Sequence, residues 1–80
     1  MTSAFIFIQV GGLASMAELK QMHDALHAVP GVKSVHFVAG PIDVIVFADA
    51  ADPAGLSAII GGIRQVKGVA SSDTRIVMSM

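Results

Sequence analysis

A short motif occurs twice in this chain, and each copy follows a segment with helical hydrophobic spacing. VPGVKS occupies positions 29–34, and VKGVAS occupies positions 66–71, 37 residues later. Glycine after the last helical turn ends a helix, and the β-branched residue that follows favours an extended strand. The sequence therefore predicts two similar halves, each with a helix that leads into a strand.

Four strands and two helices are predicted from hydrophobic spacing and turn residues. Ser15 and Glu18 form a capping box at the start of the first helix, and Asp52 followed by Pro53 is typical of the start of the second. The first helix is expected to end at Pro30-Gly31. The apolar stripe of each helix comprises Leu19, Met22, Leu26 and Val29 in the first and Leu56, Ile59, Ile60, Ile63 and Val66 in the second. Strands are expected at 4–10, 33–39, 42–48 and about 70–78.

This order of elements predicts an α+β fold, the ferredoxin-like βαββαβ sandwich, over a single domain at 1–80. Right-handed crossovers make the first and third strands central and the second and fourth strands edges. Two helices cover only one face of such a sheet, yet AFIFIQV and IDVIVFA are apolar on both faces. Of the 80 residues, 54% are hydrophobic, which is more apolar material than a small monomer buries. We therefore expect a second copy to cover the other face, which gives a homodimeric α/β barrel.

Composition argues against several classes of function. The five basic residues are scattered through a chain of net charge −1, so direct nucleic-acid binding is not expected. The absence of cysteine excludes disulfides and thiolate metal sites and favours the cytoplasm. No apolar run approaches the roughly 20 residues that a membrane span needs.

Asp43 is the candidate functional residue that stands out, because it is an acid inside the apolar run HFVAGPIDVIVF. An acid beside the Gly40-Pro41 turn can accept local backbone N–H bonds, which is a structural role. It can also hold a cationic group of a ligand. The residues alone favour the structural role and leave the second reading open.

The three histidines are weaker candidates for a functional role. His23 and His27 are four apart on the first helix, a spacing that can bind one metal ion, but no third ligand is evident although Asp24 is near in sequence. A solvated helix flank is the favoured interpretation, and no metal site or cofactor is predicted. His36 lies on a predicted edge strand, and we expect it at an interface.

The ordered set of motifs resembles the effector-binding (RAM) domain of the Lrp/AsnC family of transcriptional regulators. The features are a helix ending in PGV, a strand ending in Gly-x-x-Asp, a second helix, and GV followed by a Ser/Thr-x-Thr pair before an apolar strand. They extend over residues 4–78. The chain has no room for the helix-turn-helix that family members usually carry, so it resembles the stand-alone form of the domain.

The resemblance implies a non-enzymatic module that binds a small molecule, such as an amino acid, between subunits. It implies no catalytic residues, and it assigns the effector contacts to Gly40, Ile42, Asp43, Ser72 and Thr74. Pro41 departs from the family pattern, because it has no backbone N–H and cannot supply a donor from its position in the loop. The implied partners are a second copy, a higher ring of dimers, an amino-acid effector and full-length Lrp/AsnC regulators.

Two other functions stay open at this stage. A small dimeric α/β-barrel enzyme of the monooxygenase kind would need a titratable group in a closed pocket, and the candidates are His36 and Asp43. A purely structural oligomerisation module would have the same interfaces with no space for a ligand.

Overall fold

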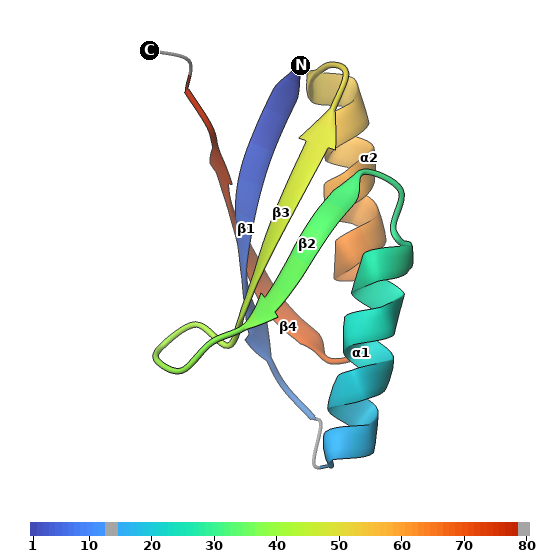
Figure 1. The fold of residues 1–80 in the computed structure, drawn as a ribbon, viewed down its shortest axis with the longest axis vertical. Coiled ribbons are helices and arrows are strands. Elements are labelled where there is room, and N and C mark those ends of the chain that lie inside the picture. Colours follow the sequence, from blue (N-terminus) through green and yellow to red (C-terminus); the bar gives the residue numbers. More distant parts are fainter. Residues whose placement is uncertain (13–14, 79–80) are drawn as a thin grey trace.

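The computed structural model describes residues 1–12 and 15–78, and its six elements follow the predicted order (Figure 1). They are β1 (Thr2–Val10), α1 (Met16–Ala28), β2 (Val32–Phe37), β3 (Val44–Ala50), α2 (Pro53–Arg64) and β4 (Val69–Ile76). This is the βαββαβ order of the ferredoxin-like α+β fold, so the predicted fold class is confirmed.

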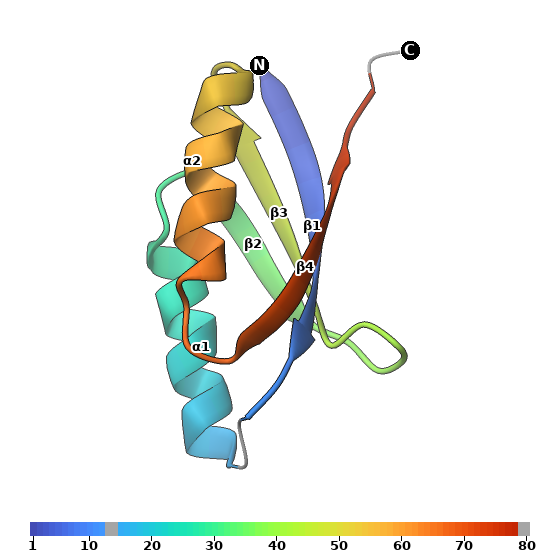
Figure 2. The ribbon, with the colours of Figure 1, turned by 180° about the vertical axis from the view of Figure 1, so that it is seen from behind.

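The four strands form one antiparallel sheet with the order β2-β3-β1-β4. The predicted assignment of the first and third strands to the centre is therefore correct. Both helices lie on the same side of the sheet, as the two opposite views show (Figures 1 and 2). Among residues 1–12 and 15–78 no element lies on the other face, as expected for a sheet with two crossover helices.

The core lies between the sheet and the two helices. Alternate residues of the central strands point toward the helices, and Ile6, Ile8, Val44 and Val46 are fully buried there. The helices contribute Met22, Leu26, Leu56, Ile59 and Ile63, all members of the predicted apolar stripes. No polar or charged side chain among the described residues is buried in this layer. The core is thus held by apolar burial alone.

The connection between β2 and β3 differs from the sequence prediction. Strand β2 ends at Phe37 rather than at position 39, and β3 begins at Val44 rather than at position 42. The backbone N–H of Val38 donates to the Asp43 carbonyl at 2.9 Å, which closes a loop over 38–43. Gly40 in this loop has φ +137°, a conformation that side-chain-bearing residues rarely adopt. Asp43 therefore precedes β3 instead of lying within it.

The helix starts are formed as the sequence predicts. Ser15 Oγ accepts from the Glu18 N–H at 3.2 Å, and Asp52 Oδ1 accepts from the Gly55 N–H at 2.8 Å. Pro53 occupies the first turn of α2, where a missing N–H costs nothing. These bonds satisfy backbone donors that have no partner inside the helix.

The cap of α2 gives a first prediction. Replacement of Asp52 by alanine should lower the free energy of unfolding by about 1 kcal/mol, because the Gly55 N–H loses its acceptor. Denaturant unfolding followed by circular dichroism would measure this loss. Asp52→Asn keeps a side-chain acceptor and should stay within about 0.5 kcal/mol of the parent chain. Equal losses in the two variants would show that the cap oxygen is not what stabilises this end of α2.

Neither helix is long and apolar enough to cross a bilayer, as judged over the described residues.

Candidate functional site

Asp43 holds the C-terminal end of β1. Its backbone N–H donates to the Ile8 carbonyl at 3.1 Å, and its Oδ2 accepts from the Val10 N–H at 2.9 Å. The carboxylate is half-buried, so these bonds form partly shielded from water. The structural role considered for this residue is therefore present. A carboxylate has about four lone-pair positions, so one bond from Val10 does not exhaust its capacity to bind a cation.

The carboxylate also lines a groove between the first half of α1 and the sheet. The volume of this α1 groove is about 880 Å³. Its lining is mainly apolar, with Lys20, His23 and Asp43 as the ionisable members. The apolar members are Val10, Met16, Ala17, Leu19, Phe37 and Val38. A groove of this size and composition can hold an apolar group of a small molecule beside a few polar contacts.

Gly40 and Ile42 lie in the same loop as Asp43. Gln9 Nε2 donates to the Pro41 carbonyl at 3.2 Å, which ties the exposed part of the loop to β1. Ile42 is half-buried, while Gly40 is exposed. The loop thus presents its backbone to solvent at the rim of the sheet, where a ligand or a neighbouring chain can reach it.

Ser72 and Thr74 occupy β4, on the other side of β1 from Asp43. The register pairs Ser72 with Ile8 and Thr74 with Ile6. Because Ile6 and Ile8 point into the core, both hydroxyl residues are on the helix-facing side, which agrees with the prediction that they share a face. Neither lines the α1 groove, and Ser72 lines a separate hollow beside Arg64.

Within one chain the five predicted residues do not share one pocket, and Thr74 pairs with Ile6 at the middle of β1, away from the loop over 38–43. Asp43 and Ser72 both contact the Ile8 position of β1, from opposite edges of that strand. Neighbouring strands are about 4.8 Å apart, so the two residues are separated by roughly 10 Å. A ligand that contacts the loop and β4 at once must bridge the end of β1.

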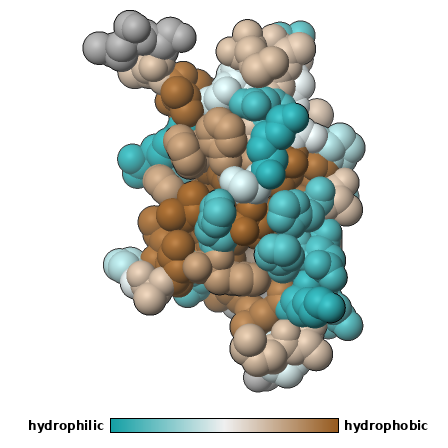
Figure 3. Space-filling model, viewed as in Figure 1, coloured by the Kyte–Doolittle hydropathy of each residue, from teal (hydrophilic) through white to brown (hydrophobic). Residues whose placement is uncertain are grey.

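The open face of the sheet carries an aromatic cluster that the sequence predicted only as apolar strands. The rings of Phe5 and Phe47 lie 4.9 Å apart between centroids, and Arg75 lies 5.7 Å above the Phe7 ring. Ile45 is on the same face, where it pairs with Phe7. Figure 3 shows hydrophobic surface over the strands, while hydrophilic surface lies mainly on the side of the helices.

Polar pairs border this cluster. Ser3 bonds to Asp49, Ser71 donates to Gln9 at 3.0 Å, and Arg75 bonds twice to Asp73. The hydrogen bonding of the Arg75 guanidinium to the Asp73 carboxylate, and then the negative charge of Asp73, raise the pKa of Arg75. An apolar centre with a polar border is the usual anatomy of a protein interface. In β4, the spacing of two between Ser71, Asp73 and Arg75 is the sequence signal that could have placed these residues on one face.

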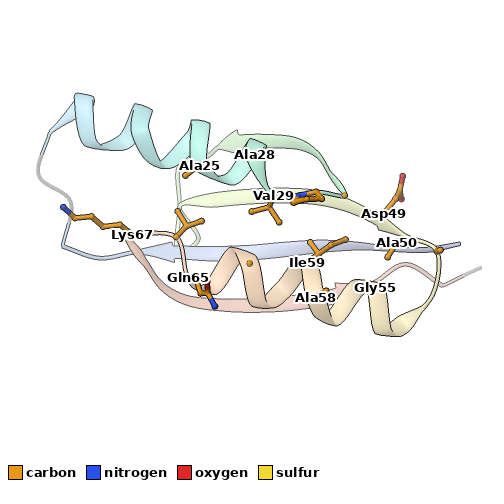
Figure 4. A pocket seen from close by; sticks show the side chains of 15 residues that line it. Ala25, Ala28, Val29, Asp49, Ala50, Gly55, Ala58, Ile59, Gln65 and Lys67 are labelled. Carbon is orange, nitrogen blue, oxygen red and sulfur yellow. The ribbon is translucent and has the colours of Figure 1, made fainter.

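A second groove runs between the two helices (Figure 4). Its volume is about 860 Å³, and it reaches from the end of α1 along α2, from Gly55 to Gly62, and on to Lys67. Its walls are made mainly of small residues, including Ala25, Ala28, Gly55, Ala58 and Gly62. A Cβ on Gly62 would lie 3.1 Å from Val29 Cγ1, so this glycine lets the end of α1 approach α2. Sequence reasoning did not predict this groove, although its small residues recur at helical spacing.

Comparison with known protein families shows which family the chain belongs to. Residues 3–80 match the family model described as the Lrp/AsnC ligand binding domain. The chain belongs to this family. The match extends over almost the whole sequence, which confirms the resemblance drawn from the ordered motifs.

Solved structures of similar fold include both short and long proteins. FFRP-DM1 has a TM-score of 0.81 and 25% identity, with 98% of this chain and 100% of that chain covered. A transcriptional regulator of Neisseria meningitidis, solved in complex with L-Met, has a TM-score of 0.84 and 18% identity. This chain covers 50% of that regulator, and at this identity the likeness is one of fold alone.

A curated relative lies outside transcriptional regulation. Homocitrate synthase of Sulfurisphaera tokodaii is 45% identical over 53 residues, which are 66% of this chain and 12% of the enzyme. The chain thus spans only a small part of that protein. The match relates this Lrp/AsnC domain to one segment of the enzyme and says nothing of its chemistry.

The Lrp/AsnC assignment points to a regulatory role rather than a catalytic one. His36, the histidine considered for an enzyme, is exposed on the edge strand β2 and lines neither of the two grooves described above. The described residues also contain no cluster of three or more histidine, aspartate or glutamate side chains arranged to hold a metal ion.

Proposed function

We propose that this Lrp/AsnC domain is a cytoplasmic amino-acid-sensing and oligomerisation module that does not itself bind DNA. The observation that carries the proposal is the match of residues 3–80 to a ligand-binding domain. The aromatic open face supports dimerisation, and a ring of dimers would bring the loop over 38–43 against a neighbouring subunit. The module would act by joining or modulating full-length Lrp/AsnC regulators.

An amino acid is the effector class that fits the chemistry of the site best. The Asp43 carboxylate can pair with an α-ammonium group, and the Ser72 and Thr74 hydroxyls can donate to an α-carboxylate. The backbone at the exposed Gly40 and the half-buried Ile42 would add polar contacts from the loop. Support comes also from the Neisseria regulator, which was solved with L-Met.

The lack of DNA binding is proposed from charge. Net charge is −1, and the five basic residues are distributed over both helices, two strands and the turn between α2 and β4, as Lys20, Lys33, Arg64, Lys67 and Arg75. Phosphate backbones require several cations on one surface. An electrophoretic mobility-shift series at low salt tests this, and a shift at micromolar protein would contradict it.

Asp43→Asn is the sharpest test of amino-acid binding. The amide oxygen can still accept from the Val10 N–H, so the loop should keep its fold while the site loses its negative charge. We expect the affinity for an amino acid with a free α-ammonium group to fall about tenfold or more. Thermal shift against the common amino acids, followed by calorimetry on those that stabilise the parent chain, measures this.

Lys33→Gln serves as the matched control, because it removes a charge from the exposed side of β2. Its affinity should equal that of the parent chain. If no amino acid at millimolar concentration stabilises the parent chain, amino-acid sensing is wrong. If Asp43→Asn binds as tightly as the parent, sensing survives but Asp43 is not the ammonium partner.

A further inference from the structure

We infer that His23 and His27 form a chelating site for a divalent transition-metal ion on the exposed flank of α1. The sequence offers only two histidines at a spacing of four, which favoured a solvated helix flank. The structure adds the separation of the two rings and a carboxylate placed beside one of them. Neither observation involves any of the five predicted effector residues.

The separation of the rings suits one shared ion. Their centroids lie 4.7 Å apart, with the ring planes at 60°. An imidazole nitrogen binds a transition metal at about 2.0–2.1 Å, which puts each ring centroid about 3.2 Å from the ion. For ligand angles of about 90–110°, the two centroids would then be about 4.5–5.2 Å apart. The observed separation falls inside this range and is compatible with one ion shared by the two rings.

The neighbours of His23 favour the tautomer of its ring that can bind a metal ion through Nε2. Asp24 Oδ1 lies 3.4 Å from His23 Nδ1, and the Phe37 ring lies 5.9 Å from the His23 ring. A carboxylate beside Nδ1 favours a proton on that nitrogen and leaves Nε2 free to bind metal, as in the carboxylate–histidine pairs of metal sites. Phe37 limits the rotation of the ring on the side toward β2.

The donor set predicts which ions bind. Among the described residues no third protein ligand completes the site, so water would occupy the remaining positions. Two imidazoles with water suit Ni²⁺ and Cu²⁺ better than Zn²⁺, which prefers four protein ligands in structural sites. A bound ion would lie at the rim of the α1 groove, because His23 is one of the residues that line it.

Calorimetric titration of the untagged full chain with Ni²⁺, in a buffer that does not chelate metals, tests the inference. We expect one ion per chain. His27→Gln should weaken binding by about tenfold or more, because the second ligand acts at high effective concentration. Asp24→Asn should weaken it by up to about tenfold, through the orientation and basicity of His23.

The remaining histidine supplies the matched control. The chain has three histidines in all, and His36 lies on β2 away from this pair, so His36→Gln should bind Ni²⁺ as the parent does. Circular dichroism checks that each variant is folded. Equal binding by His27→Gln and the parent, or loss of binding in His36→Gln, would overturn the inference.

Discussion

Phe47→Glu should leave the chain monomeric at micromolar concentrations at which the parent chain is a dimer. The Phe47 ring lies at the centre of the open face, against Phe5 on the neighbouring strand. In the proposed dimer this position is covered by the second sheet, so a carboxylate there would lose its water without gaining a partner. Buried aromatic positions near the centre of an interface dominate binding energy. We expect the dimer dissociation constant to rise at least about 100-fold.

Analytical ultracentrifugation over a dilution series measures the change, and Phe5→Glu should act in the same direction. Ser57→Glu is the control, because it adds the same charge on the exposed surface of α2, in the helical layer. That variant should keep the dissociation constant of the parent. A dimer that survives both phenylalanine replacements would place the interface elsewhere, and a parent chain that is monomeric at micromolar concentration would remove the basis of the proposed assembly.

The topology could be predicted because its determinants are local and repeated. The two PGV-like turns place a strand after each helix, and the caps at Ser15 and Asp52 fix where each helix begins. Strand centrality then follows from the handedness of the crossovers. None of these steps requires knowledge of a contact between distant residues.

The loop over 38–43 was predicted less well because its ends are fixed by such distant contacts. IDVIVFA is apolar apart from Asp43, so its composition does not show where pairing with β1 begins. The Val10 N–H and the Ile8 carbonyl decide this, by binding the side chain and the backbone of Asp43. The same long-range bonds give Asp43 its structural role, which the sequence could only offer as one of two readings.

The grooves depend on how the helices pack on the sheet, whereas the geometry of the histidine pair depends on side-chain rotamers within α1. The spacing of four predicted that His23 and His27 lie on one side of α1. It did not predict the distance between their rings or the position of Asp24 relative to the His23 ring. Likewise, helical spacing of small residues does not show that Gly62 meets Val29. The contact between Gly62 and Val29 arises from helix packing, which a pattern of apolar residues constrains only loosely.

Gly31→Ala should be the most destabilising of the single-methyl additions to this chain. Gly31 has φ +96°, where an alanine costs about 1–2 kcal/mol. Its Cβ would lie 2.4 Å from Ile59 Cδ1 and 2.9 Å from the Asp49 carbonyl oxygen. Ile59 is buried in the core, and Asp49 is held by a bond from its N–H to the Gly31 carbonyl at 2.9 Å, so neither neighbour yields freely. We expect a total loss of about 2–4 kcal/mol of the free energy of unfolding.

A loss of this size is a large share of the roughly 5–15 kcal/mol that stabilises most folded proteins, and should lower Tm by roughly 10 °C or more. Thermal and denaturant unfolding measure it, at one fixed chain concentration because association shifts Tm. Gly61→Ala is the control, since a Cβ there meets nothing within 4 Å in a helix. That variant should be stabilised, by up to about 1 kcal/mol, through helix propensity. Similar stability of the two variants would mean that the turn into β2 tolerates a side chain, and that the first PGV motif does not fix the path from α1 to the sheet.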